Sequence, residues 1–97
     1  MPLLFYSARA LADLDRLLDF LAEQDATVAV DAAGLIADAV SVLARHPYIG
    51  RPVRGDLREL VISHGRTGYV ALYRVQPRRE RVEVLVVRHQ REAGFSS

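Results

Sequence analysis

His46 to Ser63, HPYIGRPVRGDLRELVIS, is the stretch that decides the fold. Before it, apolar residues recur at the three- and four-residue spacing of helices, and after it they alternate as in strands. Pro47 ends the helical part, because the residue before a proline is pushed out of the helical region. Gly50, Pro52 and Gly55 then predict several irregular residues. The sequence therefore predicts one change in this stretch, from helices to a sheet.

Two helices are predicted on the N-terminal side of this stretch. Leucines form a single stripe over residues 8–24, which indicates a face packed in the core, and Ser7 is a suitable N-cap. A second helix begins at Asp25 or Thr27 and runs to about Arg45, and the short connection predicts an antiparallel helical hairpin. The polar residues of the first helix are expected to face solvent: Asp13, Arg16, Asp19 and Glu23.

Four strands are predicted in all. Leu3 to Tyr6 is a short apolar run that we expect to form an edge strand. Strands at 57–63, 69–76 and 81–90, joined by turns at 64–68 and 77–80, make an antiparallel meander. The last strand is expected to be central and covered on both faces, with Val82, Val84 and Val86 on one side and Glu83, Leu85 and Val87 on the other.

The predicted fold class is therefore α+β, as one small domain over residues 1–97. Its order is an N-terminal strand, an antiparallel helical hairpin and a three-stranded antiparallel meander. With the helices on one face of the sheet, the other face is left free.

The composition excludes several classes of function. The chain has no cysteine, which rules out a disulfide framework, a thiolate zinc site and sulfur redox chemistry. Its apolar runs are short and broken by charge, so we expect no transmembrane helix, no signal peptide and a cytoplasmic location. The histidines at 46, 64 and 89 lack metal-ligand spacing, and no glycine-rich phosphate loop is present. We expect neither a metal nor a small-molecule cofactor.

The net charge of +1 conceals a division between the two halves of the chain. Residues 1–44 contain two arginines and seven acidic residues, net −5, whereas residues 45–97 contain eleven arginines and five acidic residues, net +6. A basic sheet beside an acidic helical layer predicts an anionic partner, either nucleic acid or an acidic peptide.

Four blocks of the sequence, in this order, resemble the RelE/ParE superfamily of bacterial type II toxins. They are His46-Pro47 with Gly50-Arg51-Pro52-Val53; Arg58-Glu59-Leu60-Val61-Ile62; Gly68 through Val75; and Val84 through Val87 with Arg88-His89-Gln90-Arg91-Glu92. Together with the order of elements, the resemblance covers essentially the whole chain. It implies a cytoplasmic toxin neutralised by a cognate antitoxin protein, whose C-terminal segment would wrap it.

The superfamily divides by mechanism: RelE-like members cleave mRNA in the ribosome, whereas ParE-like members inhibit DNA gyrase and are not nucleases. RNA cleavage through the 2′-hydroxyl requires a base, cations for the phosphate and an acid for the leaving oxygen. Arg58 and Arg91 match basic positions of the RelE pattern. Leu60 and Val70 replace two further basic residues, and Phe95 replaces the catalytic tyrosine. The resemblance therefore favours the ParE-like side.

We expect the toxin of a plasmid-stabilisation system, a gyrase inhibitor rather than an enzyme. Its target-binding basic patch would comprise Arg51, Arg54, Arg58, Arg88 and Arg91. The alternative is a ribosome-dependent mRNA endonuclease, in which His89 acts as acid or base with Arg58 and Arg91. We favour a structural His89, hydrogen-bonded to the neighbouring strand or to the Gly50–Arg51 loop. A third hypothesis is a non-toxic nucleic-acid-binding domain, which the charge division supports equally.

Overall fold

One residue, Asp25, ends the first helix and begins the second. In the computed structural model, which describes residues 2–64 and 67–90, its N–H donates to the carbonyl of Leu21 at 2.9 Å. Its carboxylate accepts from the N–H of Thr27 at 2.8 Å. Ser7 caps the first helix in the same way, accepting from the N–H of Ala10 at 3.0 Å. The predicted helical hairpin is confirmed.

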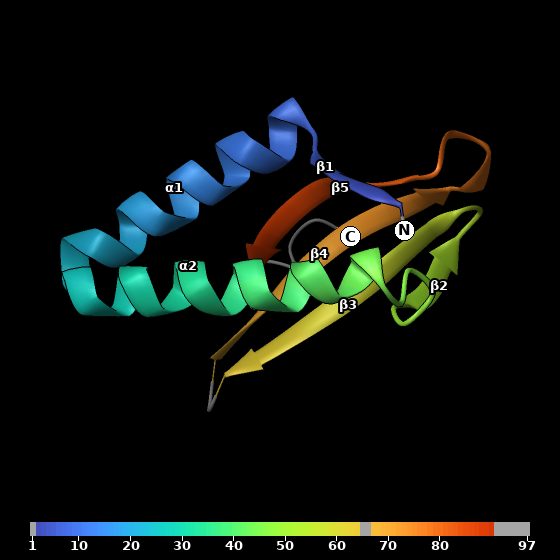
Figure 1. The fold of residues 1–97 in the computed structure, drawn as a ribbon. Helices are drawn as coiled ribbons and strands as arrows, with labels where there is room; N and C mark the ends of the chain where they lie inside the picture. The colour runs from blue at the N-terminus through green and yellow to red at the C-terminus, as the bar shows by residue number, and fades with distance from the viewer. Residues whose placement is uncertain (1, 65–66, 91–97) are drawn as a thin grey trace.

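The described residues form two layers, a five-stranded sheet with both helices lying across one face (Figure 1). In chain order the elements are β1 (Leu3–Tyr6), α1 (Ala8–Gln24), α2 (Ala26–Ser41), the 3-10 turn η1 (Val42–Ala44), β2 (Arg51–Arg54), β3 (Leu57–His64), β4 (Thr67–Gln76), the 3-10 turn η2 (Pro77–Arg79) and β5 (Arg81–His89). The predicted α+β class and the order of elements are confirmed. The connection between β3 and β4 is shorter than the predicted turn at 64–68, because both strands extend into it.

The sheet order is β1-β5-β4-β3-β2. β1 is parallel to β5, and every other neighbouring pair is antiparallel, so the predicted meander and N-terminal edge strand are confirmed. The prediction of irregular chain after Gly50 was wrong, because Arg51–Arg54 forms the other edge strand, β2, with Arg51 opposite Glu59. Pro52 is compatible with this strand because an edge strand leaves one side of its backbone unpaired.

A bulge in β5 changes which of its side chains are buried. Leu72 pairs with Val86 and Tyr73 pairs with Val84, so Leu85 is an additional residue in the ladder. The alternation therefore shifts, and Val87 instead of Val86 joins Val84 in the core. The predicted assignment of faces was wrong beyond this point. The strand is central, as predicted, but the helices cover only one of its faces.

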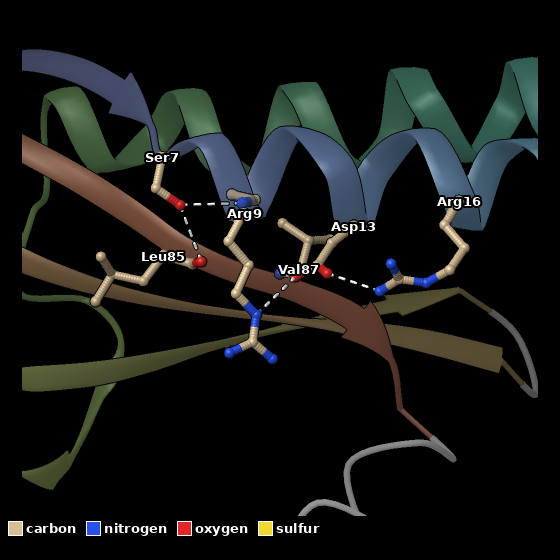
Figure 2. Close-up of polar contacts among 7 residues, drawn as sticks. Ser7, Arg9, Asp13, Arg16, Leu85 and Val87 are labelled. Carbon is tan, nitrogen blue, oxygen red and sulfur yellow. Dashed lines mark hydrogen bonds and ion pairs between the residues drawn. The ribbon is translucent and has the colours of Figure 1, made fainter.

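Side chains of α1 satisfy the backbone of β5 where β1 no longer pairs with it. The ladder between β1 and β5 ends at Val84. Beyond it, the Ser7 hydroxyl donates to the carbonyl of Leu85 at 3.0 Å, and the N–H of Val87 donates to the Asp13 carboxylate at 3.1 Å (Figure 2). The same carboxylate is paired with Arg16 at 2.7 Å. The helix thus takes the place of a strand at this edge.

Asp13 is 5% exposed, so the prediction that it faces solvent was wrong. The residue lies on the polar side of the leucine stripe, and only the position of the β5 edge brings that side into the protein. A buried carboxylate is tolerated when hydrogen bonds and ion pairs satisfy it, and Asp13 has both.

The helical stretch Ala26–Ala44 is long and apolar enough to cross a membrane by length and composition alone, with a mean hydropathy of 1.7. The sequence analysis did not single out this stretch. In the fold this stretch covers the sheet, with Ala32, Ile36 and Val40 at helical spacing and almost fully buried. We interpret it as a core helix.

Replacing Asp13 by alanine should lower the free energy of unfolding by about 2–3 kcal/mol, because the N–H of Val87 loses its acceptor and Arg16 its partner. Urea unfolding followed by circular dichroism measures this. The matched control is Asp15→Ala, an exposed acid on the same helix, which should change stability by no more than about 0.5 kcal/mol. Equal unfolding midpoints for the two variants would contradict the assigned role of Asp13.

Candidate functional site

The loop from His46 to Gly50 is held against the sheet by one buried hydroxyl. Tyr73 lies in the middle of β4 and is 0% exposed. Its hydroxyl donates to the carbonyl of Pro47 at 2.7 Å and accepts from the N–H of Gly50 at 2.8 Å. Both backbone groups belong to a segment outside any helix or strand, so these bonds set its conformation.

Gly50 is required at its position by lack of space. A Cβ atom there would lie 2.6 Å from the hydroxyl oxygen of Tyr73 and 2.8 Å from the carbonyl oxygen of Glu59, both far inside contact distance. The glycine therefore allows the loop backbone to approach the sheet closely. The sequence analysis attributed this glycine to turn formation alone.

Arg58 is the second anchor of the loop. It is opposite Tyr73 in the β3–β4 ladder, so its side chain emerges on the helix-covered face. Its guanidinium donates to the carbonyl of Gly50 at 2.7 Å and to that of Tyr48 at 3.1 Å. It also lies 4.9 Å from the centre of the Tyr48 ring. One nitrogen of its guanidinium is therefore engaged by the loop backbone.

Burial raises the pKa of the Tyr73 hydroxyl above its ordinary value of 10.0, while the hydrogen bond from Gly50 and the charge of Arg58 oppose the shift. Burial also raises the pKa of Tyr6. At neutral pH the Tyr73 hydroxyl thus stays protonated and can donate to Pro47. This tyrosine is a structural hydrogen-bonding group and not an acid ready to lose its proton.

Two further arginines of the predicted target-binding patch, Arg51 and Arg54, lie on the edge strand β2 beside this loop. Arg51 pairs with Glu59 at 2.8 Å, and its side chain is 74% exposed. Arg54 is exposed at the end of the strand. The structure thus brings together Arg51, Arg54 and Arg58 at one end of β3, in three different environments: an exposed ion pair, open solvent and the interior of a loop.

His89 and Arg88 lie at the other end of the sheet. His89 is opposite Tyr69, and their rings meet edge to face with centroids 5.6 Å apart. Since Arg58 is opposite Tyr73, four residues along β4, it lies about 13 Å from His89 along the strand direction. Arg88 alternates with His89, so its side chain emerges on the free face, opposite Val70. The predicted Arg91 lies outside the described residues.

Of the predicted catalytic set, the described residues include Arg58 and His89, and the fold does not bring these two together. The ring of His89 packs edge to face against Tyr69 of the neighbouring strand and lies at the far end of β4 from the Gly50–Arg51 loop. Within residues 2–64 and 67–90, no group of three or more histidine or acidic residues could hold a metal ion. As described, the arrangement at the Arg58 end can recognise a surface but offers no acid–base pair.

Sequence reasoning overlooked the exposed residues that this anchored loop presents. Tyr48 is 56% exposed and Ile49 is 57% exposed, although both are large and apolar. Sequence reasoning also assigned no role to the hydroxyl of Tyr73. The only sequence signal was the apolar run Pro47-Tyr48-Ile49 in a turn. A local pattern cannot show whether such a run is buried or exposed, because the fold decides which way its side chains face.

Comparisons with known proteins agree with this architecture. The sequence model of a family described as the ParE toxin of the type II toxin–antitoxin system, parDE, matches residues 4–94. Toxin RelE3 of Caulobacter vibrioides is 37% identical over 84 residues, 87% of this chain and 89% of the relative. Toxin RelE1 of the same organism is 36% identical over 69 residues, 71% of this chain and 74% of the relative.

A solved structure, described as the chromosomal ParDE TA system from P. aeruginosa, has the same fold. The TM-score is 0.76 with 25% sequence identity, and the match covers 91% of this chain and 95% of that chain. The predicted resemblance is confirmed by sequence and by fold.

Tyr73→Phe should lower the free energy of unfolding by about 1–3 kcal/mol, because it leaves a buried N–H at Gly50 and a carbonyl at Pro47 without their partner. The measurement is urea unfolding at neutral pH. Tyr48→Phe removes an equivalent hydroxyl from an exposed ring and should cost no more than about 0.5 kcal/mol. Similar losses in both variants would show that the Tyr73 hydroxyl does not anchor the loop.

Stability should also fall as the pH rises above about 10, the pKa of an unperturbed tyrosine. The raised pKa values of Tyr73 and Tyr6 mean that the unfolded chain loses protons that the folded chain still holds. The contribution of the two tyrosines to the free energy of unfolding is therefore complete below about pH 10. It is lost as the pH rises through their pKa values in the folded protein. Denaturation midpoints measured from pH 8 to 11 should show a shallower alkaline decline in Tyr73→Phe than in the wild type. An identical decline would contradict this assignment.

Proposed function

Because the chain belongs to the ParE toxin family of type II toxin–antitoxin systems, we propose that it arrests growth by binding and inhibiting DNA gyrase. Membership of this family makes it the toxin of a pair and implies a cognate antitoxin as its partner. The proposed place of action is the cytoplasm, where gyrase and its DNA are found. The target would be recognised by contact, without a chemical step on it.

The observation that supports gyrase over mRNA is the use made of Arg58. In a nuclease this residue would stabilise the charged phosphate, but Nη1 of its guanidinium donates hydrogen bonds to two carbonyl oxygens of the 46–50 loop. His89, the candidate acid or base, lies about 13 Å away along β4. Acid–base catalysis requires these groups to converge within hydrogen-bonding reach of one substrate.

The second candidate function is cleavage of mRNA on the ribosome. It is favoured by the names of the two relatives, RelE3 and RelE1, which are more than a third identical to this chain. In that case the reaction would take place at the C-terminal end of β5, where Arg88 and His89 lie close in sequence to Arg91. Arg58 would then act on the loop and not on the phosphate.

Purified toxin should inhibit supercoiling by gyrase, and addition of the antitoxin should restore activity. His89→Ala should retain this inhibition and its toxicity to within about twofold, because the histidine has no chemical role in this proposal. The control for the loss of a histidine is His46→Ala, which replaces an exposed histidine on the loop. A nuclease would instead lose about 10²- to 10⁴-fold in mRNA cleavage on translating ribosomes. Unaffected gyrase together with a non-toxic His89→Ala variant would overturn the proposal.

A further inference from the structure

The residues Pro47 and Tyr48 stand between two hollows in the protein surface. The first, of about 260 Å³, is lined by residues that include Pro2, Pro47, Tyr48, Pro77, Glu80 and Arg81. The second, of about 540 Å³ and open to solvent, is lined by Arg45, His46, Pro47, Tyr48 and Ile49. Because both hollows share Pro47 and Tyr48, they lie side by side. We refer to Pro47, Tyr48 and the two hollows as the Tyr48 ridge.

The Tyr48 ridge is held in place from beneath. The Tyr73 hydroxyl donates a hydrogen bond to the carbonyl of Pro47. Arg58 donates one to the carbonyl of Tyr48, and its guanidinium lies over the ring of Tyr48. An exposed aromatic side chain on a fixed backbone loses little conformational freedom when a partner binds. Tyrosine and arginine are also the residues that contribute most often to the energy of protein interfaces.

The charged residues that line the two hollows are two arginines and one acid. Arg45 lines one hollow, and Arg81 lines the other together with Glu80. Arg81 is oriented by a hydrogen bond from its Nε to the side-chain oxygen of Gln76. A partner segment with carboxylates beside its apolar residues would complement this surface.

We propose that the Tyr48 ridge is a docking site for an extended, acidic segment of a partner protein that places one apolar side chain in each hollow. Two neighbouring hollows with Pro47 and Tyr48 between them suit side chains that project from an extended chain. Arg45 and Arg81 would pair with the acidic residues of that chain. The proposal does not require a choice between gyrase and mRNA as the target, because it concerns the binding of a protein segment to the toxin itself.

A nucleic acid fits the ridge less well. Three prolines line the first hollow, and Tyr48 is the single aromatic residue that lines both, whereas single strands bind on several flat aromatic side chains. The guanidinium of Arg58 already lies over the Tyr48 ring, which leaves less of it for a base.

The test is selection of random peptides of about twelve residues, long enough to span both hollows. The displayed peptides are first depleted on Tyr48→Ala and then selected on the wild-type toxin. Enriched peptides are labelled and titrated against the wild type, Tyr48→Ala and Arg45→Glu. Two matched controls are Phe20→Ala, an equally exposed aromatic residue on α1, and Arg54→Glu, an exposed arginine that lines neither hollow.

The expected peptides carry more acidic than basic residues and two apolar residues at a constant spacing. Their affinity should fall at least about tenfold in Tyr48→Ala and in Arg45→Glu, and about twofold or less in the two controls. The absence of peptides that prefer the wild type, or enrichment of basic peptides, would overturn the proposal. So would unchanged affinity in Arg45→Glu, which keeps the test valid if Tyr48→Ala does not fold.

Two further outcomes would assign the ridge to another partner. Displacement of the peptide by single-stranded RNA or DNA at lower concentration than by unlabelled peptide would make it a nucleic-acid site. Dimerisation of the wild type that Tyr48→Ala abolishes would make it a contact between two copies. Either result overturns the proposed acidic protein segment.

Discussion

The Tyr73 hydroxyl joins the end of the helical half of the chain to the centre of the sheet. Both of its hydrogen bonds go to backbone groups of the 46–50 loop, and a buried hydroxyl must keep such partners. Gly50 can approach it only because it lacks a Cβ atom. Once this approach is set, Arg58 is turned into the loop, and Tyr48 is turned outward. The surface that this end of the molecule offers to partners depends on that one contact.

The arginines show why charge counts do not locate a site. The division between an acidic and a basic half describes the long-range field of the protein, which attracts anionic partners. It does not show whether side chains converge. In the fold, Arg58 supports a loop and Arg51 is paired with Glu59, while His89 packs against Tyr69 at the other end of β4. Residues of the same type therefore serve different purposes, since Arg58 holds a loop whereas Arg54 is exposed to solvent.

The contact between α1 and β5 shows how the fold closes an unpaired strand edge. A short β1 leaves the backbone of β5 exposed beyond Val84, and Ser7 and Asp13 satisfy it from the first turns of the helix. The bulge at Leu85 lies at the same place and brings Val87 into the core. An edge capped by side chains in this way is not available for pairing with another strand at those positions. Helix, bulge and edge thus form one structural unit.

Local patterns in the sequence determined the helical hairpin, the meander and the N-terminal strand, because helix periodicity, caps and turn residues act over a few positions. The toxin family followed from the resemblance of four sequence blocks to known toxins. Only the tertiary structure decided that Arg51–Arg54 pairs as an edge strand, that Asp13 is buried and that Tyr48 is exposed. It also decided which arginines are used internally. These outcomes depend on groups far apart in the chain, such as the Tyr73 hydroxyl and Gly50 or Asp13 and Val87. No local pattern records whether such groups meet.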